Sequence, residues 1–184
     1  MARKTVFDRE YILEKTSDFI KDYGVDAMNA RDLCKYIGCS TQPLFKNFIS
    51  MEGLNKSLKK YLHDYYDSFI DVIVDKSDYL YTISYAYCLF ACKEPKVFKA
   101  LFMTELAGSR TIEEVLNSSW NIDTIKSIPK QYGLSKKQSE RLYRDVRFFT
   151  HGLSCQIACN SIEVSEDEIK KLIRDIINKL KNVV

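Results

Sequence analysis

The stretch from residue 29 to 48, NARDLCKYIGCSTQPLFKNF, constrains the fold of this chain more than any other part of it. Its pattern predicts two short amphipathic helices that are joined by a tight turn. Asn29 is suited to cap the first helix, and Gly38 supplies the left-handed position that ends it. In the second helix, Leu44 and Phe48 are four residues apart and therefore lie on one buried face. The buried face of the first helix is predicted to consist of Ala30, Leu33, Cys34 and Ile37.

The second of these helices has an unusually polar free face. Ser40 is placed to cap it, and Pro43 falls in its first turn, where a missing N–H has no cost. The outward side chains are Thr41, Gln42, Pro43, Lys46 and Asn47. Such groups suit the major groove of DNA, because base edges are recognised by hydrogen bonds and apolar contacts. The stretch therefore predicts a helix-turn-helix with residues 40–48 as the recognition helix. A helical hairpin without a role in DNA binding is the alternative.

The composition favours an all-α protein with short connections. Of 184 residues only 6 are Gly and 3 are Pro, and four of the glycines fall where a helical pattern stops. The net charge of +3 is concentrated in residues 1–60, as a polyanionic partner such as DNA requires. No apolar run is long enough to span a membrane, and the N-terminus lacks the apolar core of a signal peptide. We therefore expect a cytoplasmic protein whose six cysteines are reduced thiols.

The helical pattern continues on both sides of the central stretch and predicts about nine helices in two domains. We expect a DNA-binding domain of residues 1–49 and a ligand-binding and dimerisation domain of residues 50–184, connected by a long helix over 50–75. The first helix runs over 8–23 with Asp8 as its cap, and its inner stripe includes Tyr23. Val72 belongs to the inner stripe of the long helix. Later helices are expected to start at Asp78, at Pro95, at Thr111 with Glu114, at Ser135 with Gln138, and at Ser165 with Glu168. The helix that opens at Thr111 is expected to be disturbed around residues 117–123 and at Pro129.

The turn and its flanks resemble the N-terminal domain of the tetracycline-repressor (TetR) family over about residues 8–62. The shared elements are Gly38-Cys39-Ser40, Leu44-Phe45, Phe48, Ser50-Met51-Glu52 and Leu54. The resemblance implies base-facing positions at Thr41, Gln42, Pro43 and Asn47, and phosphate-facing positions at Arg31, Ser40 and Lys46.

Two residues depart from the family's pattern. Phe45 replaces a tyrosine whose hydroxyl commonly contacts a phosphate, and Met51 replaces a lysine. Neither side chain can make the contact of the residue that it replaces, and Lys56, Lys59 and Lys60 are the candidate replacements.

The C-terminal part carries the expected dimer and ligand sites. Its last two helices each have an apolar face and resemble the dimerising bundle of the family, which suits the two-fold symmetry of a palindromic operator in double-stranded DNA. Aromatic residues and one histidine are the candidates for binding a small apolar effector. They are Tyr65, Tyr85, Phe90, Phe102, Trp120, Phe149 and His151. For each of them, packing in the core or a structurally satisfied histidine is the alternative.

Two pairs of cysteines, Cys88 with Cys92 and Cys155 with Cys159, are each spaced four residues apart on a predicted helix. They suggest a thiol- or metal-sensing regulator on the same scaffold, although the Cys-x-x-Cys loop of common zinc sites is absent. The motifs of phosphate loops, serine hydrolases and zinc peptidases are also absent, so we expect no enzyme, no catalytic residues, no metal and no cofactor. The sequence thus predicts a homodimeric repressor that an apolar small molecule releases from its operator. A helical interaction module is the remaining alternative.

Overall fold

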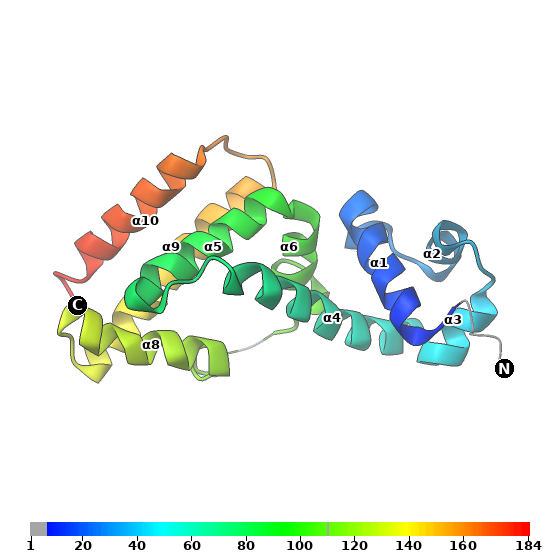
Figure 1. Cartoon of the computed structure of the whole chain (residues 1–184), viewed down its shortest axis with the longest axis horizontal. Helices are drawn as coiled ribbons and strands as arrows, with labels where there is room; N and C mark the ends of the chain where they lie inside the picture. Colours follow the sequence, from blue (N-terminus) through cyan, green and yellow to red (C-terminus); the bar gives the residue numbers. More distant parts are fainter. Residues whose placement is uncertain (1–6, 110) are drawn as a thin grey trace. The chain divides into compact units, whose positions relative to one another are not determined.

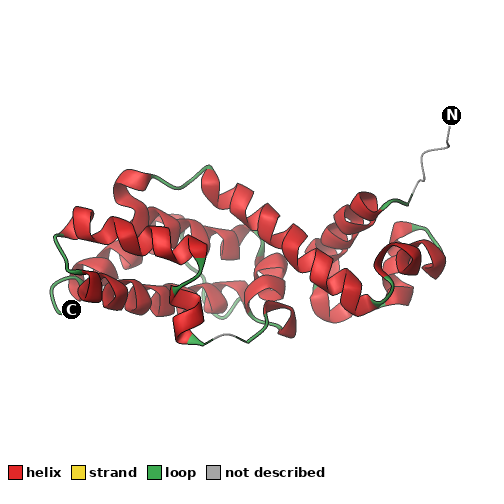
Figure 2. Ribbon diagram, turned by 90° about the horizontal axis from the view of Figure 1, so that it is seen from below, coloured by secondary structure: helices red, strands yellow, loops and turns green. Residues whose placement is uncertain are grey.

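The computed structural model describes residues 7–109 and 111–184, and in this part of the chain all regular structure is helical. Figures 1 and 2 show the helices and their order. The α-helices are α1 (Arg9–Tyr23), α2 (Ala30–Ile37), α3 (Thr41–Phe48), α4 (Met51–Asp71), α5 (Tyr79–Lys93), α6 (Pro95–Phe102), α7 (Ile112–Leu116), α8 (Ser119–Tyr132), α9 (Lys136–Ala158) and α10 (Glu166–Leu180). Three short 3-10 helices, η1 (Val25–Ala27), η2 (Lys76–Asp78) and η3 (Glu105–Ala107), lie between them. The predicted all-α class is confirmed.

The helix count differs from the expected nine because the segment after Thr111 forms two helices. α7 ends at Leu116, and α8 begins three residues later at Ser119. The side chain of Asn121 donates to the backbone carbonyl of Val115 at 2.5 Å and accepts the hydroxyl of Tyr143 at 2.5 Å, which holds the break in place. Pro129, where a second disturbance was expected, lies inside α8 without ending it.

Three further expectations about helix boundaries and faces are wrong. α4 ends at Asp71 and not at residue 75, because the following Val72, Ile73 and Val74 are β-branched and favour a helix less than straight side chains do. Val72 is 85% exposed and lies outside the helix whose inner face it was expected to join. Tyr23, at the last position of α1, is 60% exposed, with its ring against Phe19 at 5.1 Å.

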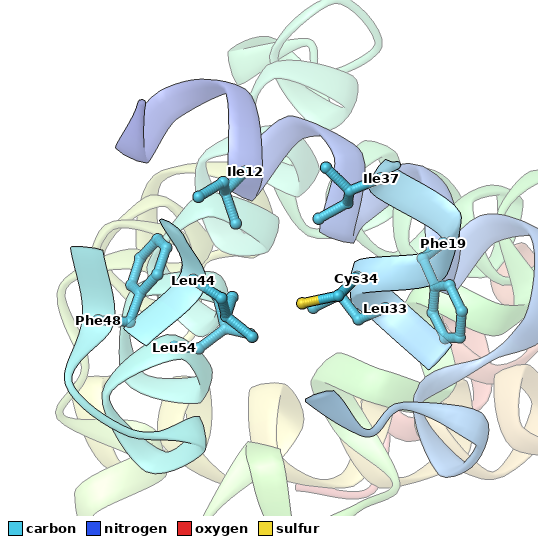
Figure 3. Packing of buried hydrophobic residues seen from close by; sticks show 8 residues of the cluster. All are labelled: Ile12, Phe19, Leu33, Cys34, Ile37, Leu44, Phe48 and Leu54. Carbon is cyan, nitrogen blue, oxygen red and sulfur yellow. The ribbon is translucent and has the colours of Figure 1, made fainter. Parts of the chain in front are cut away.

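The chain divides into two compact units, and this division differs from the expected boundary after residue 49. Unit 1 consists of the described part of Met1–Tyr66 together with Lys96–Gly108. Its core joins α1, α2, α3 and the start of α4, and Figure 3 shows eight of its side chains. They are Ile12, Phe19, Leu33, Cys34, Ile37, Leu44, Phe48 and Leu54. α6 belongs to this unit through contacts such as that of Phe102 with Tyr66, whose ring centroids are 5.3 Å apart.

Unit 2 consists of Asp67–Pro95 and Ser109–Val184. α5, the most apolar helix, packs against α8, α9 and α10, and its Phe90 is fully buried. α5, α9 and α10 lie side by side in Figure 1. Ion pairs and ring contacts join α10 to α5. Arg174 pairs with Asp78, its guanidinium lies 3.4 Å from the ring centroid of Tyr81, and Glu166 pairs with Lys93 at 2.9 Å.

Candidate nucleic-acid interface

The turn between α2 and α3 has the geometry that the sequence predicts. The side chain of Asn29 accepts the N–H of Asp32 at 3.0 Å and so caps α2. Gly38 adopts φ 78° and ψ 34°, the left-handed conformation that glycine reaches without a steric penalty. The N–H of Gly38 and that of Cys39 both donate to the carbonyl of Cys34, at 3.0 and 2.9 Å. These bonds satisfy the last carbonyls of α2 and set the direction in which α3 starts.

α3 separates a buried face from a polar exposed face. Leu44 and Phe48 are 1% and 3% exposed, as expected. The predicted contact residues Ser40, Thr41, Gln42 and Lys46 are exposed, and Pro43 is half-buried. The expected cap at Ser40 is only partly correct. Its backbone has the N-cap conformation, but its hydroxyl makes no capping hydrogen bond, which leaves the hydroxyl available at the start of the helix.

Asn47 is held by the fold of unit 1, although it was expected to face the bases. Its side-chain amide donates to the carbonyl of Pro43 at 2.8 Å and to that of Phe7 at 3.1 Å, and the residue is half-buried. Both amide hydrogens are therefore used within the protein. Because an amide has only two hydrogens, Asn47 can meet a base edge as an acceptor but not as a second donor.

Arg9 has a structural role in unit 1 that the sequence pattern did not indicate. Its guanidinium donates to the carbonyl of Asn47 at 2.6 Å and to the hydroxyl of Ser57 at 2.5 Å. It also lies 4.5 Å from the ring centroid of Phe48. One side chain of α1 thus holds the end of α3 and the second turn of α4. These partners are about 40 or more residues away in the sequence, so no local pattern identifies them.

The cations expected to face phosphates lie on the surface of unit 1. Arg31 in the first turn of α2, Lys46 in α3 and Lys56 in α4 are all exposed. Lys60 pairs with Asp64 at 2.7 Å, and both side chains are well exposed. An exposed pair of this kind stabilises little and exchanges readily with other anions.

The end of α3 exposes two apolar side chains one turn apart. Phe45, in the place of the family's tyrosine, is 38% exposed, and Ile49 is 88% exposed. Ile49 has φ 67° and ψ −45°, and the N–H of Ser50 donates to the carbonyl of Phe48 at 2.7 Å across it. This is a classic γ-turn, which is rare and strained for a residue that is not glycine. The change at Phe45 is visible in the sequence, whereas no sequence pattern indicates the conformation of Ile49.

The predicted ligand residues are divided between the two units. Tyr65 and Phe102 belong to unit 1, where the ammonium of Lys21 lies 4.0 Å from the ring centroid of Tyr65. The others belong to unit 2. There Phe90 is fully buried, Phe149 is half-buried, and the hydroxyl of Tyr85 donates to Glu166 at 3.2 Å. Residue 120 lies in α8, but the side chain of Trp120 is outside the described residues.

His151 lies in a polar network inside unit 2. Its Nδ1 is 2.9 Å from the hydroxyl of Tyr87, and its Nε2 is 3.5 Å from the sulfur of Cys155. Burial lowers the pKa of His151, and the nearby Arg147 lowers it further, which favours the neutral ring. A neutral ring has one donor and one acceptor, which matches the two partners. The expected anchor therefore has protein partners of its own.

The cysteines give little support to a metal or thiol sensor. All six are free thiols, and Cys88 is buried with a pKa raised by burial to about 12. Burial also raises the pKa values of Cys92 and Cys155. These thiols stay protonated at neutral pH, whereas the thiolate is the form that binds metal or reacts. Across the described ranges, no three His, Cys, Asp or Glu side chains gather as a metal site.

None of the helices in the described part of the chain is long and apolar enough to cross a membrane.

Comparisons with known proteins were made for the sequence and for the fold. No protein-family model and no curated protein matches the sequence. The fold is similar to that of a TetR-like transcriptional regulator from a Rhodococcus species, with a TM-score of 0.68, 12% identity and 100% of both chains covered. A second TetR-family regulator from Rhodococcus has a TM-score of 0.67 and 14% identity over 94% of this chain and 98% of that one. A TetR variant from Acinetobacter baumannii in complex with minocycline has a TM-score of 0.59 and 15% identity, with 95% and 94% covered.

The protein therefore has a TetR-like fold over nearly its whole length. The likeness agrees with the motif around Gly38-Cys39-Ser40, which lies at the turn between α2 and α3.

Proposed function

We propose that this protein is a transcriptional regulator that binds double-stranded DNA through α3. The observation that carries the proposal is the exposed face of α3, where short hydrogen-bonding side chains stand on a helix that two buried apolar residues hold in place. Thr41 and Gln42, at the N-terminal end of α3, are the best placed to meet base edges. The TetR-like fold supports this assignment, because it accounts for the rest of the chain as well.

Phosphate contacts are assigned to a set of exposed residues around the turn. They are Arg31, Ser40, Lys46 and Lys56. Arg31 and Lys56 lie on helices on either side of α3 along the chain, so contacts from both would fix its orientation in the groove. Phe45 cannot donate a hydrogen bond to a phosphate, and we assign to it an apolar contact with sugars or thymine methyl groups.

The regulator is proposed to act as a homodimer on a palindromic operator, and as a repressor that a small molecule releases. Phe148 on α9 is 56% exposed and Leu172 on α10 is 38% exposed, and both suit an apolar contact with a second copy. α4 follows α3 directly and continues into unit 2, so a ligand bound there acts on a helix that reaches the DNA-binding unit. The minocycline complex of the Acinetobacter protein supports a small-molecule ligand for this fold.

The test is selection of bound fragments from random DNA at two salt concentrations, followed by affinity measurements on the enriched site. We expect a palindromic site whose affinity falls steeply as salt rises. Gln42→Ala should weaken specific binding by about 1–3 kcal/mol and leave non-specific binding nearly unchanged. Lys46→Ala should weaken binding to all sequences and lower the salt slope by about one.

Lys171→Ala is the matched control for Lys46→Ala, because it removes the same charge from an exposed position of α10 in unit 2. Its affinity for DNA should equal that of the unchanged protein. Failure to enrich any site even at low salt would refute DNA binding. An enriched site whose affinity Gln42→Ala leaves intact would refute the assignment of α3 as the recognition helix.

A further inference from the structure

Unit 2 contains a pocket of about 400 Å³ whose described lining includes none of the predicted ligand residues. It is formed by the last turn of α4 and the residues after it, by η2, by the first half of α5 and by α8. A volume of this size lies within the range of pockets for small organic molecules.

The pocket combines an apolar wall with an aromatic ring. Ile70 is 2% exposed and forms part of the wall with Val74 and Ile83, which are half-buried. Tyr79, at the start of α5, is also half-buried and lines the same space. An aliphatic wall beside an aromatic ring favours the apolar body of a ligand, and the face of the ring attracts a positive charge.

Two carboxylates lie at the same pocket, Asp71 at the end of α4 and Asp123 in α8. Both are close enough to Tyr79 to raise the pKa of its hydroxyl, in addition to the larger effect of burial. Asp71 has no ion-pair partner in the described ranges, and Asp123 has only an exposed contact with Lys126 at 4.0 Å. Lys76 is the one ammonium among the described lining residues. The lining is therefore acidic on balance.

The chemistry of the lining selects among ligand classes. Both carboxylates are exposed to solvent, so a bound anion would be repelled by them and a neutral ligand would gain nothing from their charge. A metal ion requires more oxygen ligands than these, and no group of three acidic, His or Cys side chains gathers in the described residues. An organic cation satisfies the carboxylates, the ring and the aliphatic wall together.

We propose that this pocket binds an organic cation with an apolar body, such as a quaternary phosphonium or ammonium compound. The positive centre lies between Asp71, Asp123 and the ring of Tyr79, and the apolar groups contact Ile70 and Ile83. Because Asp71 ends the helix that begins next to α3, the cation is also assigned as the effector. The proposed binding of the cation depends only on the pocket, whereas its role as effector rests on the proposed DNA-binding function.

The binding test uses two ions of the same shape and opposite charge, tetraphenylphosphonium and tetraphenylborate, titrated into the full chain by calorimetry without DNA. We expect the phosphonium to bind at one site per chain and the borate to bind at least tenfold more weakly. Equal affinities for the two ions, or no binding of the phosphonium, would overturn the proposal.

Variants then locate the site. Asp71→Asn combined with Asp123→Asn should weaken phosphonium binding by about tenfold, as expected for two partly exposed charge contacts. Asp175→Asn removes the same charge from an exposed position of α10 and should leave the affinity unchanged. An unchanged affinity in the double variant would place the cation elsewhere and overturn the assignment of this pocket. Circular dichroism of the double variant confirms that it is folded before its affinity is compared.

The effector role has a separate measurement. If the protein binds a selected operator, phosphonium should release it from that operator, and the double variant should require about tenfold more phosphonium for half release. Phosphonium that binds to the pocket but leaves operator affinity unchanged would overturn the effector role alone. A protein that binds phosphonium but no DNA would overturn the proposed function and leave the binding site standing.

Discussion

Ile49 shows how a single residue can lie in an unfavourable conformation beside a candidate site. Its φ of 67° belongs to the region that L-residues rarely adopt, and its branched side chain is 88% exposed. The side chain gains almost no burial that would offset the backbone strain, which is of the order of 1–2 kcal/mol. Strain that packing does not repay is characteristic of positions kept for function, and Ile49 directly follows α3.

Ile49→Gly is expected to stabilise the protein. Glycine adopts positive φ without strain but loses more chain entropy on folding, so the net gain in the free energy of unfolding is about 0.5–1 kcal/mol. Urea unfolding followed by circular dichroism measures it. Ile49→Val, which keeps a branched side chain at the same φ, is the control and should show no gain. Equal stabilities of the two variants would contradict the strain.

The first turn of α4 lies very close to the end of α3 at Gly53, which has no side chain. A Cβ at this position would lie 2.1 Å from the carbonyl oxygen of Phe48, far inside any allowed contact. The hydroxyl of Ser50 also accepts the N–H of Gly53 at 3.1 Å and so caps α4. The first turn of α4 can therefore pack against the end of α3 only with glycine here, and this packing orients α3.

Gly53→Ala should destabilise unit 1 by about 1–3 kcal/mol, although alanine is the better helix former. Gly152→Ala in α9 is the matched control when both variants are compared at a concentration at which the protein is monomeric, because within one chain nothing beyond the adjoining backbone lies within 4 Å of the added Cβ. That variant should gain up to about 1 kcal/mol from helix propensity. Thermal unfolding of the two variants measures both changes in stability. A gain in both would show that α3 and α4 do not pack as closely as described.

At the scale of the whole molecule, the exposed apolar residues of unit 2 are the features that a single copy leaves unexplained. Phe148 lies on α9 among exposed positions 141, 148, 152 and 156, which are four or seven residues apart and therefore share one face of the helix. This stripe faces away from the core that α9 forms with α5 and α8. It fits the proposed contact with a second copy, because two equal stripes can meet across a two-fold axis.

Phe148→Glu should shift the protein from dimer to monomer, since two carboxylates would be brought together without partners. Sedimentation equilibrium measures the association, and we expect the dissociation constant to rise at least a hundredfold, or about 3 kcal/mol. Ile112→Glu in α7 is the control, because Ile112 is also 56% exposed and lies off the stripe. A dimer that Phe148→Glu leaves intact would exclude this face as the interface.

The sequence predicted most of the helix boundaries and caps, but fewer of the residues that form the candidate sites. The caps at Asp8 and Asn29 and the three capping boxes are as expected, because each joins residues no more than three positions apart. The residues predicted to bind the effector were identified by their aromatic type and not by their positions in the fold. Among its described members, Phe90 is buried in the core, while Tyr65, Tyr85, Phe102 and His151 have protein partners, since aromatic side chains are what a helical core is largely built from.

The sequence alone determined the helical class, the turn at Gly38 and the polar face of α3, because periodicity and capping act within one or two helical turns. The tertiary structure alone decided that Arg9 holds Asn47, and that Ile70, Tyr79 and Asp123 line one pocket. Arg9 and Asn47 are 38 residues apart, and the pocket joins three helices. Contacts of this kind depend on how the helices pack, because side chains distant in sequence meet only after each helix has buried its apolar face.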